Sequence, residues 1–298
     1  MNTLNAQNKL RHILLILSLL ALCAGCQSKN AKPADGLVDI GTHRLYIHCT
    51  GDGSPVVVLD VGLGESYDNW QPIVEQLALD TMVCVYDRAG YGASQPGPLP
   101  RHSRQVAEEL MSLLENAGVP APYLLVGHSL GGLNVQVFAD LYPEAVMGAV
   151  LLDPPPQAWI DGSGDFPALY EMADQQTLEF SRTAAALGQS SDPAESARAG
   201  FFQALASEHE AMFNESAVQA GAIQSFDDLP LVVIQSGAPN PAFGESAAAF
   251  QQFWVEQSRA LAGKSSQGRF ILAEASGHAV YQDAPDTVID AVRGILNS

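Results

Sequence analysis

Basic residues are scarce in this sequence of 298 residues, which holds 14 Lys and Arg against 33 Asp and Glu and carries a formal net charge of -19. Nucleic-acid-binding surfaces need clustered Lys and Arg to displace the counterions of the phosphate backbone, and this sequence has no basic run. We therefore expect no nucleic-acid partner. Charged residues make up 16% of the chain and hydrophobic residues 47%, a balance that excludes an intrinsically disordered protein.

Cysteine is also scarce, and four cysteines in a chain of this length exclude a small domain built on disulfides. The length suits one large domain or two small ones. A folded chain of this size buries roughly three quarters of the surface that its unfolded form exposes, so a hydrophobic core suffices to hold it together.

The N-terminal segment contains a short apolar run, ILLILSLLAL at residues 13–22, which Lys9 and Arg11 precede without any acid. This run is too short to span a bilayer comfortably. A basic start followed by a short apolar run and small residues is typical of a secretory signal peptide. We place the signal peptide at residues 1–25 and predict an exported protein.

Cys26 follows Ala24 and Gly25, and small residues directly before a cysteine resemble the cleavage box of bacterial lipoproteins. The sequence departs from that pattern at Cys23, where Leu is usual. Ordinary cleavage and an uncleaved anchor are the alternatives. We predict that Cys26 carries a lipid, that residues 26–36 form a tether, and that the anchor holds the protein at a membrane, facing the periplasm or the cell exterior.

Export permits disulfide bonds, and Cys49 and Cys84 are the remaining cysteines. Cys49 ends the strand-like segment 43–49, and Cys84 lies inside the strand-like segment 81–86. Neighbouring strands would allow the two thiols to pair. Two buried free thiols are the alternative.

Segments with strand character alternate with segments of helical periodicity along most of the chain. The strand-like segments are 36–40, 43–49, 54–60, 81–86, 122–127, 146–153, 229–237 and 268–274, and the helical ones are 69–79, 101–118, 130–141 and 285–296. This alternation predicts an α/β protein with a mostly parallel sheet, covered by helices on both faces and opened by a hairpin at one edge.

Residues 154–228 break this alternation. They open with three prolines, become helical and Ala-rich, and contain no buried strand. We predict that they form a helical cap inserted into a core of residues 37–153 and 229–298. The cap is expected to lie over the strand ends, where open α/β sheets bind their ligands.

Ser129 is the predicted nucleophile. It lies in the segment GHSLG (127–131), directly after a strand-like segment and directly before a helical one, which is the context of a nucleophile elbow. Such a turn requires small flanking residues and presents the hydroxyl at a helix N-terminus, where backbone N–H groups favour negative charge. The alternative, a plain turn with a serine cap, needs no pair of glycines.

His278 is the predicted base, because a serine hydroxyl is a weak nucleophile without one. It follows the last strand-like segment, and the chain order Ser before His fits the elbow motif. The other six histidines lie in the signal peptide, the edge hairpin, the start of a helix, the cap, or directly beside the serine.

The acid that orients the histidine is less evident. In this architecture it usually follows the strand-like segment 229–237, but that position holds Asn240, which cannot stabilise an imidazolium by charge. Asp153 is our first choice, because it is a carboxylate at the end of the segment 146–153. Glu245 is a third possibility.

An oxyanion needs two N–H donors. We predict the backbone N–H of Leu130, directly after the nucleophile, and that of Leu63 in the Gly-rich loop VGLGE (61–65). Glycines let this loop approach a substrate closely. A plain Gly-rich turn is the alternative.

Four motifs, VGLGES, YDRAGYGAS, GHSLGG and SGHAVYQDAP, together resemble the α/β-hydrolase superfamily over the predicted core. The resemblance implies an eight-stranded sheet and hydrolysis through an acyl-enzyme on Ser129. It also implies that the strand of Cys49 neighbours that of Cys84, which supports the disulfide. Dehalogenases and epoxide hydrolases with this fold carry an Asp nucleophile, and Ser129 argues against both.

We therefore expect a serine hydrolase that acts on a small-molecule carboxylic ester, thioester or lactone and needs neither cofactor nor metal. Acyl transfer or perhydrolysis at the same site is the first alternative. The second is a non-catalytic lipoprotein that keeps the fold as a binding module. A complete Ser/His pair and an oxyanion loop argue against the second.

Overall fold

The computed structural model describes residues 34–298. The signal peptide, Cys26 and nearly all of the tether lie outside the described residues, and the predictions about them stay predictions. Within residues 34–298 we find no helix with both the length and the apolar character that crossing a membrane requires.

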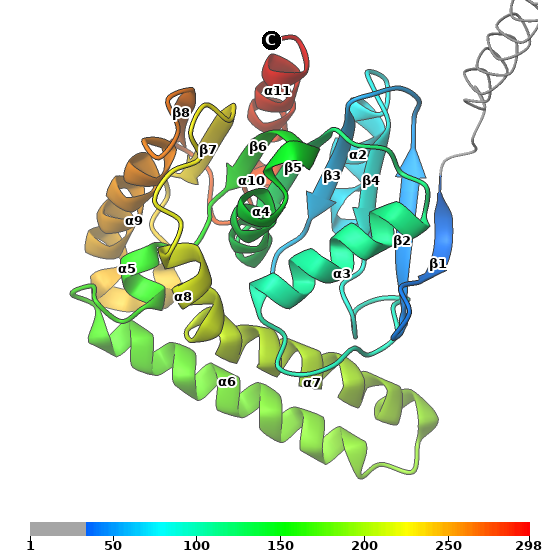
Figure 1. Cartoon of the computed structure of the whole chain (residues 1–298). Helices are drawn as coiled ribbons and strands as arrows, with labels where there is room; N and C mark the ends of the chain where they lie inside the picture. The colour runs from blue at the N-terminus through cyan, green and yellow to red at the C-terminus, as the bar shows by residue number, and fades with distance from the viewer. Residues whose placement is uncertain (1–33) are drawn as a thin grey trace, which may run out of the picture. The chain divides into compact units, whose positions relative to one another are not determined.

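Eight strands form one sheet in the order β1-β2-β4-β3-β5-β6-β7-β8 (Figure 1). The strands are β1 (Asp35–Asp39), β2 (Arg44–Thr50), β3 (Val56–Asp60), β4 (Val83–Tyr86), β5 (Tyr123–His128), β6 (Val146–Leu152), β7 (Leu231–Ser236) and β8 (Gly268–Ala273). The β1–β2 and β2–β4 pairs are antiparallel, and the others are parallel. The predicted eight-stranded, mostly parallel sheet with an edge hairpin is confirmed.

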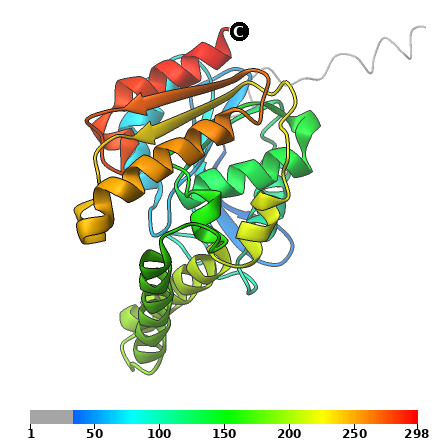
Figure 2. The same ribbon diagram turned by 90° about the vertical axis from the view of Figure 1, so that its left-hand side faces the viewer.

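The strands divide their side chains between two cores, because successive residues of a strand face opposite sides of the sheet. In β3, Val56 and Val58 join one core, and Val57 and Leu59 join the other. Helices cover both sides (Figure 2). The first core includes residues of α3 (Ser103–Asn116), α4 (Leu130–Leu141) and α9 (Ala247–Ala262), and the second those of α2 (Gln71–Leu77) and α11 (Pro285–Leu296).

Residues 154–228 contain no strand and form four helices. These are α5 (Gln157–Ile160), α6 (Pro167–Gly188), α7 (Pro193–Met212) and α8 (Glu215–Gly221). The long helices α6 and α7 run side by side and project away from the sheet (Figures 1 and 2). Residues of this segment line the same pocket as residues at the ends of β5, β6 and β7.

Cys49 in β2 and Cys84 in β4 are direct partners in the antiparallel register. They form a disulfide with an S–S distance of 2.07 Å. The bridge that the resemblance implied is therefore present.

Candidate active site

Ser129 lies at the turn between β5 and α4, with a φ of 51° and a ψ of -120°. Residues other than glycine rarely adopt a positive φ, so the surrounding structure must enforce this conformation. A Cβ atom on Gly127 would lie 2.5 Å from the carbonyl oxygen of Gly131, and one on Gly131 would lie 2.0 Å from that of Asp60. Larger residues are therefore excluded on both sides of Ser129, which is the physical basis of the GHSLG pattern.

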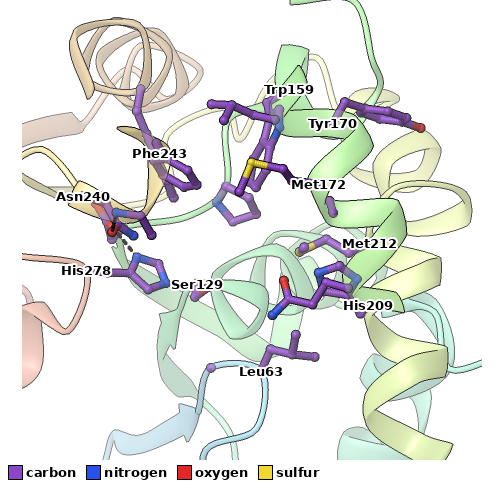
Figure 3. A pocket seen from close by; sticks show the side chains of 18 of the residues that line it. Leu63, Ser129, Trp159, Tyr170, Met172, His209, Met212, Asn240, Phe243 and His278 are labelled. Carbon is purple, nitrogen blue, oxygen red and sulfur yellow. Dashed lines mark hydrogen bonds and ion pairs between the residues drawn. The ribbon is translucent and has the colours of Figure 1, made fainter. Parts of the chain in front are cut away.

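His278 and Ser129 line the same pocket (Figure 3). The Nδ1 atom of His278 lies 2.5 Å from Oδ2 of Asp153, the residue that follows β6. This contact leaves Nε2 as the nitrogen available to a nucleophile. The structure thus brings the predicted nucleophile, base and first-choice acid to one site.

Asp153 is 1% exposed, and its buried carboxylate is held by several donors. Its Oδ1 atom accepts hydrogen bonds from the backbone N–H of Ser236 at 2.9 Å, from the hydroxyl of Ser236 at 2.7 Å and from Nε2 of Gln235. These donors replace the water that a buried carboxylate loses. They also leave Oδ2 to face His278.

The other two candidates for the acid lie elsewhere. Oδ1 of Asn240 accepts a hydrogen bond from the N–H of Ala242 at 3.0 Å and caps the short helix η3 (Pro241–Ser246). Glu245 is exposed in the same helix. Within residues 34–298, Asp153 is therefore the one candidate of the three that contacts the imidazole of His278.

The pKa of His278 is raised above its usual value. Burial alone would lower this pKa, but the hydrogen bond to Asp153 and the negative charges of Asp153 and Glu65 outweigh it. The same carboxylates would stabilise an imidazolium formed when His278 accepts a proton.

Leu63 follows β3 in a loop whose carbonyl groups are held by hydrogen bonds from Arg88. Arg88 donates to the carbonyl oxygens of Val61 at 2.6 Å and of Gly62 at 2.9 Å. The C=O and N–H of one trans peptide point in opposite directions, so the Leu63 N–H points away from Arg88. Within residues 34–298, neither this N–H nor that of Leu130 has a hydrogen-bond partner. Both are free to bind an oxyanion.

Glu65 connects three loops around the site. Its carboxylate accepts from the N–H of Gly62 at 2.8 Å and from the hydroxyl of Tyr281 at 3.1 Å, and it lies 2.9 Å from Nδ1 of His128. The other nitrogen of His128 lies 2.9 Å from the carbonyl oxygen of His278. Burial would raise the pKa of Glu65, but the hydrogen bonds and the charge of His128 lower it to about 2. Glu65 is therefore a fixed anion that joins the Gly-rich loop at 61–65 to the elbow and to the segment that follows His278.

The pocket around Ser129 has a volume of about 1080 Å³ and lies between the strand ends and the cap. Its apolar walls include Leu63, Pro155, Trp159, Leu169, Met172, Met212, Phe243 and Trp254. None of the described residues that line it is Lys or Arg. No group of side chains in residues 34–298 has the composition and spacing to hold a metal ion.

A buried ion pair joins the cap to the core. Arg88 and Glu208, both 1% exposed, meet with Nε 3.1 Å from both carboxylate oxygens. Glu208 lies in α7 of the cap and also accepts from the Tyr91 hydroxyl at 2.7 Å. The Nη1 atom of the same guanidinium donates to Oδ1 of Asp60 at 2.7 Å. The cap is thus tied to Arg88, which also holds the loop that is predicted to bind the oxyanion.

Residues 55–204 match the family model described as the alpha/beta hydrolase fold. The chain belongs to the alpha/beta hydrolase family. This membership confirms the resemblance to the α/β-hydrolase superfamily that the four motifs indicated.

Among curated relatives, this alpha/beta hydrolase is similar to the uncharacterized protein YqjL of Bacillus subtilis, at 27% identity over 81% of this chain and 83% of that protein. It is 33% identical to the probable transporter efuK of Hormonema carpetanum over 40% of this chain, but the match spans 18% of that protein. A putative carbamate hydrolase RutD of Pseudomonas savastanoi is 37% identical over 37% of this chain and 42% of its own length.

Solved structures share the fold of this alpha/beta hydrolase at low identity. A thermophilic esterase from Thermogutta terrifontis matches with a TM-score of 0.61 at 19% identity and covers 90% of this chain and 98% of its own. The enol-lactonase of Burkholderia xenovorans matches with a TM-score of 0.59 at 20% identity, over 88% of this chain and all of its own. These likenesses show the fold.

Sequence reasoning missed Glu65, His128 and Glu208 as members of the site's support. The acid directly after the Gly-rich loop at 61–64 is the local signal that marks Glu65. Glu208 meets Arg88 across a separation of 120 residues, and nothing in the local sequence of α7 predicts that pairing.

Proposed function

We propose that this alpha/beta hydrolase is a serine hydrolase that cleaves a carboxylic ester, thioester or lactone through an acyl-enzyme on Ser129. The contact of His278 with a buried, fully bonded Asp153 in the pocket of Ser129 is the observation that carries the proposal. A nucleophile, a base and an orienting acid in this arrangement are the components of acyl transfer to serine.

The reaction proceeds in two halves. His278 accepts the proton of Ser129 at Nε2 while the serine oxygen bonds to the carbonyl carbon, and the N–H groups of Leu63 and Leu130 bind the oxyanion. The bond to the leaving oxygen or sulfur then breaks, and His278 returns the proton to that atom. Water attacks the acyl-enzyme with His278 again as base, which releases the acid and restores Ser129. Asp153 stabilises the imidazolium in both halves.

The composition of the pocket favours an uncharged ester over an anionic one. Within the described part of the chain, its lining contains Glu171, Asp174 and Glu179 from α6 and no cation. A carboxylate or phosphate on the substrate would lie near these acids without a counter-charge, which costs free energy.

An active-site serine probe tests this function. A fluorophosphonate should label the wild-type protein, and labelling should disappear in Ser129→Ala, whose side chain lacks the nucleophile. Hydrolysis of a short neutral ester should disappear with it. A folded wild-type protein that neither reacts with the probe nor hydrolyses any ester would contradict the proposal and leave a binding module in its place.

We also propose that the protein is exported and held at a membrane by a lipid on Cys26. The Cys49–Cys84 disulfide supports an oxidising compartment, where such bonds persist. Labelled palmitate should enter the wild-type protein in cells and not the Cys26→Ser variant, which should leave the membrane fraction. Equal incorporation in both proteins would rule out this anchor.

A further inference from the structure

His209 is a polar side chain of the cap that the proposed mechanism does not use. It lies in α7, is 4% exposed, and lines the pocket on the side opposite His278 (Figure 3). The rings of Phe180 and Phe213 pack against it, with centroids 5.6 Å and 5.3 Å away. These contacts fix the plane of the imidazole.

Thr177 in α6 determines which nitrogen of His209 carries the hydrogen. Its hydroxyl donates to the carbonyl oxygen of Ala173 at 3.2 Å, and its oxygen lies 2.7 Å from Nδ1 of His209. A hydroxyl has a single hydrogen. We assign this hydrogen to the bond with Ala173, so that Thr177 accepts a hydrogen bond from Nδ1–H. The other nitrogen, Nε2, is then an acceptor.

Nε2 of His209 has no hydrogen-bond partner within residues 34–298. Burial lowers the pKa of His209 to about 4, so the ring is neutral near neutral pH and Nε2 keeps its lone pair. Leu63 and Met212 line the same pocket, and their side chains have no hydrogen-bond donor (Figure 3). His209 lines the pocket, so a ligand that supplies a donor gains a hydrogen bond to this acceptor.

We propose that Nε2 of His209 accepts a hydrogen bond from the substrate, and that the substrate is a neutral ester with a hydroxyl or N–H group on the part that lies under the cap. This inference rests on the proposed function of the same pocket. A site built around a hydrogen bond discriminates against the analogue that lacks the donor more strongly than an apolar pocket discriminates by size. His209 is therefore a specificity-determining residue.

Matched esters test the inference. One series carries the group on the acyl side, as ethyl esters of β-hydroxybutyrate, β-methoxybutyrate and pentanoate. The other carries it on the alcohol side, as hydroxyethyl, methoxyethyl and butyl butyrate. In one of the two series, kcat/KM of the wild type should be about fivefold to tenfold higher for the hydroxyl ester than for its methoxy counterpart.

Three variants locate the effect. His209→Phe keeps an aromatic ring and should bring the hydroxyl-to-methoxy ratio to about one. Thr177→Val removes the acceptor of Nδ1–H, so that the hydrogen moves to Nε2; hydroxyl and methoxy oxygens both accept from Nε2–H, and the ratio should fall to about one. Glu210→Gln, at an exposed position of the same helix, should keep the wild-type ratio.

Two outcomes overturn the inference and differ from each other. A wild type that hydrolyses the esters without preference for the hydroxyl, or a preference that survives both His209→Phe and Thr177→Val, overturns the role of His209 and leaves the proposed function intact. A folded wild type that hydrolyses no ester and does not react with a serine probe overturns both.

Discussion

Arg88 donates from Nη2 to the carbonyl oxygen of Gly62 at 2.9 Å, in the peptide unit whose N–H belongs to Leu63. The Nε atom of the same guanidinium meets Glu208 of the cap at 3.1 Å. A residue of the cap therefore contributes to the orientation of the loop that is predicted to bind the oxyanion. We expect changes at Glu208 to affect the rate of the chemical step as well as stability.

Replacing Glu208 by Gln should lower both stability and kcat. The substitution keeps the shape of the side chain but leaves the positive charges of Arg88 and Arg101 buried without their shared partner. Breaking a buried ion pair in this way costs about 3 kcal/mol, and a less firmly held oxyanion donor lowers kcat by about tenfold. Denaturant unfolding and steady-state kinetics measure the two effects.

Glu210→Gln is the matched control for this variant, because Glu210 lies two residues further along α7 and is exposed. Its stability should stay within about 0.5 kcal/mol of the wild type. If Glu208→Gln lowers the unfolding free energy but leaves kcat unchanged, Glu208 only holds the cap against the core. The inference that Glu208 orients the loop at 61–65 through Arg88 would then be contradicted.

The identity of the triad acid can be measured directly. Asp153→Asn should lower kcat by about 10³- to 10⁴-fold, because the amide can neither hold the productive tautomer nor stabilise the imidazolium by charge. Asn240→Ala and Glu245→Gln should stay near the wild-type rate, since neither residue contacts His278. A near-normal rate in Asp153→Asn would exclude Asp153 as the acid.

The pH profile should report the raised pKa of His278. The imidazole must be neutral to accept the proton of Ser129, so kcat/KM falls as the pH drops through this pKa, which lies above the usual value of about 6.5. Glu65→Gln removes one of the negative charges that raise the pKa, and the acidic limb should therefore move to lower pH. A limb that stays in place would show that Glu65 does not act on His278 through its charge.

The elbow glycine should tolerate no side chain. The Cβ atom of Gly131→Ala would meet the carbonyl oxygen of Asp60 at 2.0 Å, so the turn must shift. We expect a loss of about 1–3 kcal/mol in stability and a large loss of activity. Gly188→Ala, at the end of α6, is the control, because its nearest neighbour would be the Cβ of Ala199 at 3.9 Å. Equal thermal stability of the two variants would contradict this account.

The fold was predictable because its signals are local. The mostly apolar runs of β3, β5 and β6 follow the requirement that strands buried on both faces be apolar. The GHSLG segment could be placed because steric exclusion at Gly127 and Gly131 leaves a direct mark on the sequence. The structure brings Ser129, His278 and Asp153 together, and their catalytic roles stay predictions that the experiments above test.

The supporting contacts were not predictable, because they join residues far apart in the chain. Glu65 meets Tyr281 across 216 residues, and Arg88 meets Glu208 across 120. Even where a local signal marks the residue, as the Gly-rich loop does for Glu65, its partner is determined by how the cap and loops pack. His209 likewise gives no sign in the sequence of α7 that it faces the pocket.

The buried pairing of Glu208 with Arg88 and Arg101 limits how this cap can be exchanged for another. A cap transplanted from a relative must present a carboxylate at the same point, or two guanidinium groups would be sealed inside the protein with too little negative charge. Chimeras that alter substrate range should therefore retain α7 around Glu208 and vary α6, whose exposed and pocket-facing positions carry no such obligation.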